Sequence, residues 1–157
     1  MSLVAAYRTA QREAEIARLR RLLALRAMVA TGMRQRQIAD ALGVSQPAVS
    51  QQLRSADNLT DVHPEVLLEA SGPLLTQTAQ ERGFTKLAVF GSVARHHARP
   101  DSDIDLLVEA PPDTSIGDLL AMREMFEQIL GRPVDLITYG GLKPGLDDDI
   151  RREAVLL

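Results

Sequence analysis

The chain of 157 residues is long enough to bury one ordinary hydrophobic core or two small ones, and with 45% apolar and 25% charged residues its composition is globular rather than disordered. The absence of cysteine excludes disulfides and thiolate metal sites, and no apolar run has the length of a membrane span or the pattern of a secretory signal, so we expect a cytoplasmic protein without a membrane partner. The net charge of −3 conceals an asymmetry that predicts two modules, the first facing a polyanion: residues 1–56 hold nine arginines against three acids, and residues 57–157 hold nine basic and eighteen acidic residues.

Helical patterns fill the chain before residue 55. Apolar side chains recur at spacings of three or four up to the stop at Thr31-Gly32, which predicts one amphipathic helix. Its apolar face would carry Ile16, Leu19, Leu23, Ala27 and Ala30. A second helix is expected from about residue 34 to residue 42, and a third from the N-cap Ser45 to about residue 54.

The second and third predicted helices can share an apolar seam across a turn in which Gly43 supplies a positive φ. The seam would contain Ile38, Ala39, Leu42, Val44, Val49 and Leu53. Short or amide-bearing side chains at the start of the third helix suit base edges in a major groove, and the arginines around them suit phosphates. The predicted DNA-binding residues are Arg34, Arg36, Ser45, Gln46, Pro47, Ser50, Gln51 and Arg54, with Gln46 the best candidate for contacting adenine.

The stretch IADALGVSQPAVSQQL, within residues 16–54, resembles a helix-turn-helix of the Cro/phage-repressor-like type. The resemblance implies binding to double-stranded operator DNA, usually as a dimer on two half-sites. The competing interpretation is a plain three-helix bundle with a basic, solvated face.

A polar stretch at residues 55–64 ends in Pro64 and predicts a domain boundary. We therefore expect an all-α helix-turn-helix domain over residues 1–56, a linker over 57–64 and a second domain over 65–157. In this second part helix and strand patterns alternate, and Ser115 with Asp118 matches a capping box. The expected helices are 64–82, 92–98, 114–131 and 145–155, and the expected strands are 86–90, 103–109 and 133–138. Such alternation predicts an α/β or α+β fold around a small mixed sheet.

Two carboxylates occupy one face of the strand expected at 103–109. Because side chains alternate between faces, Asp103 and Asp105 should point the same way, about 7 Å apart. The pair repels itself unless positive charge is near, and carboxylate oxygens suit Mg²⁺, which often also binds substrate phosphates. The sequence therefore predicts a magnesium site with a phosphate cradle close by.

The cradle is predicted at Gly91-Ser92, between a strand and a short helix whose free N–H groups would attract anions. The stretch is not a P-loop, since no Gly-Lys-Ser/Thr follows, and it lacks the further glycines of a Rossmann fingerprint. An EF-hand starting at Asp101 is improbable as well, because its sixth and twelfth positions would be Leu106 and Pro112.

The spacing of Gly91-Ser92, ten residues, then Asp103-Ile104-Asp105 resembles the signature of the DNA polymerase beta-type nucleotidyltransferase superfamily, and FGSVAR…SDIDLLVE is similar to its minimal nucleotidyltransferases. The resemblance covers about residues 64–157 and implies a third acid on a neighbouring strand, which Asp135 supplies. It further implies three catalytic carboxylates that hold two Mg²⁺ ions, and an NTP substrate, with ATP the first candidate. In this sequence the acids are Asp103, Asp105 and Asp135, and the nucleotide-binding residues are Gly91, Ser92 and Arg95.

The chain departs from this pattern after the Ala-Arg pair, where minimal members usually have glycine. Here His96 takes that position and His97 follows, and a solvated loop is the simplest interpretation of the two histidines. The departure bears on the loop conformation and not on the acids.

Minimal nucleotidyltransferases of this kind are often antitoxins. The resemblance implies transfer of AMP to an all-helical HEPN-type toxin, with the helix-turn-helix regulating the promoter, and a homodimer on DNA or a hetero-oligomer with the toxin. Two alternatives stay open. One is a transcriptional regulator whose transferase part senses nucleotide without turnover, and the other is a small-molecule nucleotidyltransferase of the aminoglycoside type.

Overall fold

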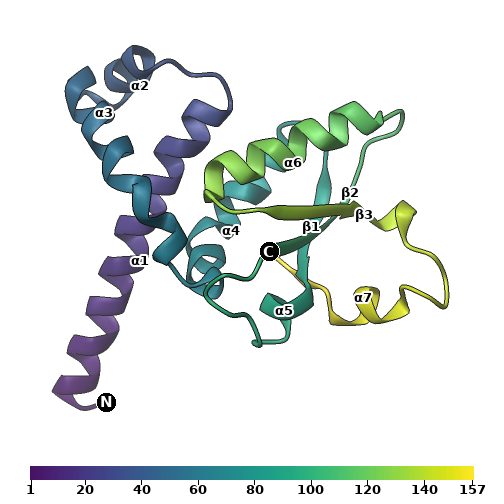
Figure 1. The fold of residues 1–157 in the computed structure, drawn as a ribbon. Coiled ribbons are helices and arrows are strands. Elements are labelled where there is room, and N and C mark those ends of the chain that lie inside the picture. The colour runs from purple at the N-terminus through teal and green to yellow at the C-terminus, as the bar shows by residue number, and fades with distance from the viewer.

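The structure is a computed structural model that describes residues 1–157, apart from the side chains of residues 56–58. Three helices and a 3-10 helix come first, and an α/β segment follows (Figure 1). In chain order the elements are α1 (Leu3–Ala30), α2 (Gln35–Leu42), α3 (Gln46–Arg54), η1 (Ser55–Asp61), α4 (Pro64–Gln80), β1 (Thr85–Phe90), α5 (Gly91–Ala94), β2 (Ile104–Glu109), α6 (Ile116–Leu130), β3 (Val134–Thr138), η2 (Tyr139–Gly141), α7 (Asp148–Glu153) and β4 (Val155–Leu156).

The four strands form one mixed sheet in the order β3-β2-β1-β4. Strand β2 pairs in parallel with β3, and β1 pairs antiparallel with both β2 and β4. The predicted small mixed sheet is therefore confirmed, with strand bounds shifted by a residue. Three elements were not predicted: η1, η2 and the two-residue β4. The helix expected over 145–155 is correspondingly shorter, Asp148–Glu153, because the chain after it is extended and pairs with β1.

One face of the sheet is covered by helices (Figure 1). The alternate strand residues Ile104, Leu106 and Val108 point to this face and are fully buried among side chains of α4 and α6. Phe126 and Leu75 are their counterparts from the helices. We call this the helix-covered face.

The opposite face has a thinner cover. Ala88, Phe90 and Leu107 pack there against Leu142 and, less tightly, Ile150. The covering elements are η2 and α7, and no residue of either is buried. We call this the C-terminal face, because residues 139–154 cover it.

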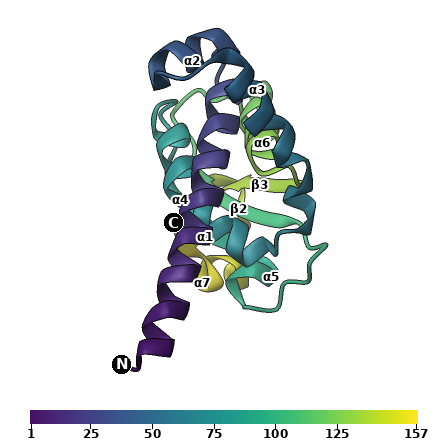
Figure 2. The same cartoon turned by 90° about the vertical axis from the view of Figure 1, so that its left-hand side faces the viewer.

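Helix α1 is shared between two cores. Leu23 and Ala27 belong to the core of the helix-covered face, whereas Leu25 packs with Ile38 and Val49 of α2 and α3. The predicted division into domains at residues 57–64 stays a prediction, and its limit at residues 56–57 lies outside the described side chains. The packing around α1 joins the segments on either side of that limit (Figure 2).

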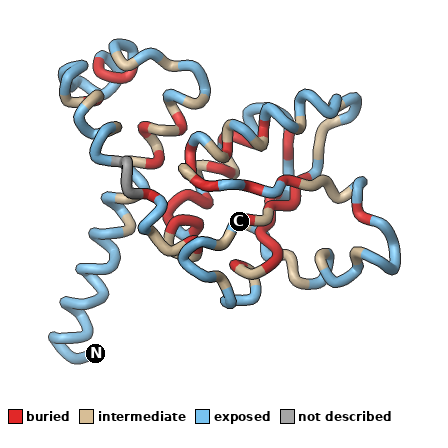
Figure 3. Tube along the Cα trace, in the orientation of Figure 1, coloured by how far each residue is buried: buried red, intermediate tan, exposed pale blue. Residues whose placement is uncertain are grey.

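Helix α1 begins at Leu3, where the Ser2 hydroxyl accepts a hydrogen bond from the N–H of Ala5. Its first turns extend away from the rest of the molecule and are exposed (Figure 3). Among the helices of the described residues, none is long and apolar enough to cross a bilayer.

The predicted seam between α2 and α3 is confirmed at its centre, where Ile38, Ala39 and Val49 are buried. The prediction is wrong for Leu42 and Val44, which lie at the turn and are 48% and 43% exposed. The turn itself follows the expected geometry, since Gly43 has φ +67° and the N–H of Val44 bonds to a carbonyl of α2.

Candidate active site

Asp105 lies near the start of β2, an inner strand of the sheet. It stands opposite Phe90 on β1 and Asp135 on β3, and because it is two residues from Leu107 it points to the C-terminal face. Its side chain is half-buried, and burial, the neighbouring carboxylate of Asp135 and the charge of Asp103 raise its pKa to about 6. The fold thus holds a carboxylate where its ionised form is disfavoured.

The other two predicted acids lie close to Asp105 along the chain and across the sheet: Asp103 directly precedes β2, and Asp135 is near the start of the neighbouring β3. Asp135 is exposed on β3, directly beside Asp105, and the residue before it is held by a hydrogen bond of 3.1 Å from the N–H of Val134 to Oε1 of Glu127. Asp103 is exposed as well and precedes β2, which begins at residue 104, so the expectation that the strand includes it is wrong by one residue.

Gly91 brings the predicted phosphate side next to this carboxylate. It has φ +73°, a conformation that L side chains rarely adopt. A Cβ built on it would lie 2.1 Å from Oδ2 of Asp105, which is far inside van der Waals contact. Only glycine fits at this position, because the backbone that follows β1 lies directly against the Asp105 side chain.

Ser92 and Arg95 occupy the short helix α5 and its end. Ser92 is half-buried and Arg95 is exposed. The predicted helix over 92–98 has only four residues, Gly91–Ala94, because the backbone turns at Arg95 and His96. The helix dipole invoked from the sequence is correspondingly small, so the anion-binding capacity rests on individual N–H groups and on Arg95.

A carboxylate that sequence analysis missed already binds these groups. Oε1 of Glu153 accepts a hydrogen bond of 2.9 Å from the N–H of Gly91, and Oε2 accepts one of 2.9 Å from Nη1 of Arg95. Glu153 is the last residue of α7, where an acid opposes the helix dipole. This unfavourable position of an acid at a helix C-terminus was the sequence signal that Glu153 has a partner elsewhere in the fold.

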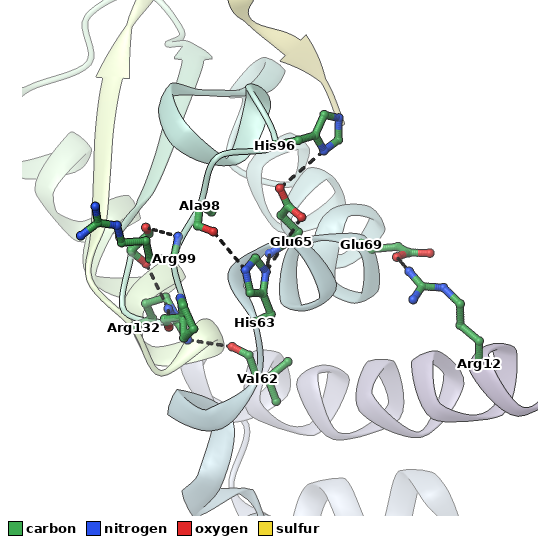
Figure 4. A network of polar contacts seen from close by, with 11 residues as sticks. Arg12, Val62, His63, Glu65, Glu69, His96, Ala98, Arg99 and Arg132 are labelled. Carbon is green, nitrogen blue, oxygen red and sulfur yellow. Dashed lines mark hydrogen bonds and ion pairs between the residues drawn. The ribbon is translucent and has the colours of Figure 1, made fainter.

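Arg132 is a second functional candidate that the sequence did not indicate. Its guanidinium is buried and donates to four carbonyl oxygens, two in the loop before Asp103 and two in the segment before α4 (Figure 4). The acceptors are Pro100 at 2.7 Å, Ser102 at 3.0 Å, Thr60 at 3.3 Å and Val62 at 2.8 Å. Arg132 therefore fixes the backbone that leads into the acidic cluster.

Histidines and a glutamate complete this loop network (Figure 4). Nε2 of His63 lies 3.1 Å from the carbonyl oxygen of Ala98, and Nδ1 of His96 lies 3.5 Å from Oε1 of Glu65. His96 has φ +57°, in the region that glycine favours. The position where glycine was expected thus keeps a glycine-like backbone despite its side chain, and His97 is exposed beside it.

The residues around Asp105 fit a divalent cation in their chemistry. The donor set is carboxylate oxygen. The pKa of Asp105 is raised by burial and then by the neighbouring acids, and Arg95 offsets this only partly, so a cation beside Asp105 would favour its ionised form. Across the side chains that the structure describes, no three acids or histidines are gathered closely enough to hold one ion. The assignment of Asp103, Asp105 and Asp135 as ligands of two ions stays a prediction.

The predicted DNA-binding residues lie at the start of α2 and along α3, from its N-cap to its last residue. Seven of the eight are exposed, and Ser50 is partly buried. The Ser45 hydroxyl caps α3 by accepting from the N–H of Ala48 at 3.2 Å, and Nε2 of Gln46 donates to Oε1 of Gln35 at 2.7 Å, across to the start of α2. The exposed residues are Arg34, Arg36, Ser45, Gln46, Pro47, Gln51 and Arg54.

Known proteins resemble the part of the chain that carries the acids. The profile of the nucleotidyltransferase domain family matches residues 74–157. The protein adenylyltransferase MntA of Thermococcus cleftensis is 37% identical over 73 residues, which are 46% of this chain and 74% of that protein. MJ0435 of Methanocaldococcus jannaschii, also named as a protein adenylyltransferase, is 40% identical over 75 residues, which are 48% of this chain and 81% of that protein.

A solved structure described as a minimal nucleotidyltransferase agrees in fold. It superposes with a TM-score of 0.54 and 35% sequence identity over 59% of this chain and 95% of that chain. The small mixed sheet, the glycine against Asp105 and the acids on adjoining strands all fall in the matched half. The chain belongs to the nucleotidyltransferase domain family.

Proposed function

We propose that the protein is a Mg²⁺-dependent protein adenylyltransferase that moves AMP from ATP to a hydroxyl of a partner protein. The observation that carries the proposal is Asp105, half-buried in the sheet between Gly91 and Asp135. Two relatives named as protein adenylyltransferases support a protein acceptor. In the reaction the acceptor oxygen bonds to the α-phosphorus of ATP, the bond to the bridging oxygen breaks, and pyrophosphate leaves.

The residues of the chain have separable roles in this proposal. Asp103, Asp105 and Asp135 would hold the magnesium ions, which supply charge stabilisation to the attacking and leaving oxygens. Asp135, exposed at the edge of the cluster, would orient the acceptor hydroxyl and accept its proton. Ser92, Arg95 and the N–H of Gly91 would bind the triphosphate.

We further propose that the partner is a HEPN-type toxin and that α2 and α3 bind operator DNA, so that the protein acts as an antitoxin that represses its own promoter. The basic composition of residues 1–56 and the exposed arginines and glutamines around α3 support DNA binding. The hydrogen bond between Gln46 and Gln35 joins the starts of α2 and α3 and would present the Gln46 amide in a fixed orientation.

The transfer reaction is tested with α-labelled ATP, Mg²⁺ and the product of the adjacent reading frame. Label on that product, lost in Asp103→Asn, is the expected result. If the protein binds ATP but labels no partner with any NTP, it is a nucleotide-sensing regulator instead. Label on an aminoglycoside would assign it a small-molecule acceptor.

DNA binding is tested by comparing operator and random duplexes at fixed salt. Gln46→Ala should weaken operator binding by about 10-fold or more and leave random DNA unchanged, because a bidentate contact to adenine discriminates between bases. Arg54→Ala should weaken both alike, because phosphate contacts carry no sequence information. An equal loss on both duplexes for Gln46→Ala would show that it reads no base.

A further inference from the structure

The carboxylate of Glu153 occupies donors that a nucleotide needs. Both of its oxygens are engaged at 2.9 Å, one by the N–H of Gly91 and one by Nη1 of Arg95. The side chain is only 22% exposed, whereas that of Arg95 is 50% exposed. This is a bidentate anion contact made by the protein's own chain.

The contact lies beside the acidic cluster and not at a remote surface. Gly91 is the residue whose backbone lies against Asp105, and Arg95 is near enough to act on the same carboxylate. An anion held by Gly91 and Arg95 is therefore within the site that the acids define. A second anion cannot use the same N–H and would also meet the charge of Glu153.

We propose that Glu153 is an internal competitor for the phosphates of the nucleotide, so that ATP must displace its carboxylate from Gly91 and Arg95 in order to bind. The proposal rests on the function proposed above, since it takes the ligand of these two groups to be a nucleoside triphosphate. Glu153 thereby sets the affinity of the site for phosphate groups.

The segment that carries Glu153 has few buried contacts with the rest of the protein. Helix α7 has six residues and none is buried, and β4 consists of Val155 and Leu156, which are 52% and 67% exposed. Elements with so few buried contacts open at low free-energy cost. Movement of α7 can therefore release the carboxylate without disturbing the helix-covered face.

The test compares ATP binding to the wild-type protein and to Glu153→Gln by calorimetry, with Mg²⁺ and without an acceptor protein. Removal of the competing charge should tighten ATP binding about tenfold, because a site that is free only part of the time shows a proportionally weakened affinity. The affinity for inorganic tripolyphosphate should rise by a similar factor, and the affinity for adenosine, which has no phosphate, should stay the same. Glu124→Gln, an exposed acid on α6, removes the same charge elsewhere and should leave ATP affinity within about twofold of the wild-type value.

Hydrogen exchange gives an independent readout. In the wild-type protein, saturating ATP should speed exchange of the amides in residues 148–156 while protecting Gly91. Unchanged or weaker ATP binding by Glu153→Gln would overturn the proposal and make Glu153 a support for Arg95. Slower exchange of 148–156 with ATP would overturn it as well.

The outcome is distinguishable from that of the proposed function. If Glu153→Gln binds tripolyphosphate more tightly but no protein is labelled, transfer to a protein acceptor is refuted and the competition by Glu153 stands. If a protein is labelled but the substitution does not raise the affinity, transfer stands and the competition is refuted.

Discussion

The two faces of the sheet differ in how they are covered, and the difference separates stability from chemistry. On the helix-covered face, Leu106 of β2 and Phe126 of α6 are fully buried in a core to which α4 and α1 also contribute. On the C-terminal face, a thin segment covers a smaller cluster, and the acids lie at its edge. Adjacent residues of β2 point to opposite faces, so Leu106 lies in the core whereas Asp105 lies in the candidate site.

The comparison predicts first that the central acid can be removed without unfolding the protein. Asp105→Asn should reduce AMP transfer by about 1000-fold or more, because it removes a metal ligand, and should leave the fold intact. Labelled transfer and thermal unfolding are measured together. Asp113→Asn, in an exposed turn, is the matched control and should keep full activity. Unfolding of Asp105→Asn would contradict the separation of the faces.

The second prediction compares apolar truncations on the two faces. Phe126→Ala should lower the free energy of unfolding by about 4 kcal/mol, because it opens a cavity in a closely packed core. Leu142→Ala, on the C-terminal face, should cost about 2 kcal/mol, because the thin cover can collapse around it. Urea denaturation measures both, and equal losses would show that the faces are packed alike.

The third prediction concerns Gly91, the first residue of α5. Gly91→Ala should destabilise the protein by about 3 kcal/mol and abolish transfer, since its Cβ would strike the Asp105 carboxylate and its φ is positive. Gly145→Ala shares the positive φ, at +83°, but has open space around its Cβ. It should cost only about 1 kcal/mol and keep activity, so the difference isolates the contact with Asp105.

The smallest predicted effect is a pH dependence. In a buffer without divalent ions, the folded state holds the proton of Asp105 up to about pH 6, whereas the unfolded state loses it near 3.8. Stability should therefore fall as pH rises from about 4 to 6 and then level off. Because the side chain is half-exposed, we expect about 1 kcal/mol, seen as a stabilisation by Asp105→Asn at pH 7 that is missing at pH 4. An equal effect of the substitution at both pH values would contradict this origin.

The local elements were readable from the sequence because they depend on short-range rules. Ser115 and Asp118 form the predicted capping box, in which the N–H of Asp118 donates to Oγ of Ser115 at 3.0 Å and the N–H of Ser115 donates to Oδ2 of Asp118 at 2.9 Å. The backbone hydrogen bond from Ser115 also lowers the pKa of Asp118. Ser45 caps α3, and Gly43 ends α2 with a positive φ, as expected. The placement of Asp135 beside Asp105 was expected only because the resemblance to minimal nucleotidyltransferases implied a third acid on a neighbouring strand.

The long-range polar contacts were not readable, because nothing in spacing or periodicity encodes them. Arg132 follows a helix-ending glycine and looks like an ordinary surface arginine, yet it is 7% exposed and bonds to carbonyls up to 72 residues away. For Glu153 the sequence offers one weak signal, because an acidic residue at the C-terminal end of a helix is unfavourable without a partner. The exposure of Leu42 and Val44 was missed for the related reason that α1, and not the turn, fills the small core.

The sharing of α1 between two cores has a consequence for how the chain folds as it is synthesised. Arg26 of α1 bonds to the carbonyl of Ile129 at a sequence separation of 103 residues. The side of α1 that faces α6 therefore stays uncovered until α6 has been synthesised, whereas Leu25 can pack earlier against α2 and α3. Non-local contacts of this kind slow folding and leave apolar surface exposed in the meantime, so the nascent chain is most prone to aggregation between the synthesis of α1 and that of α6.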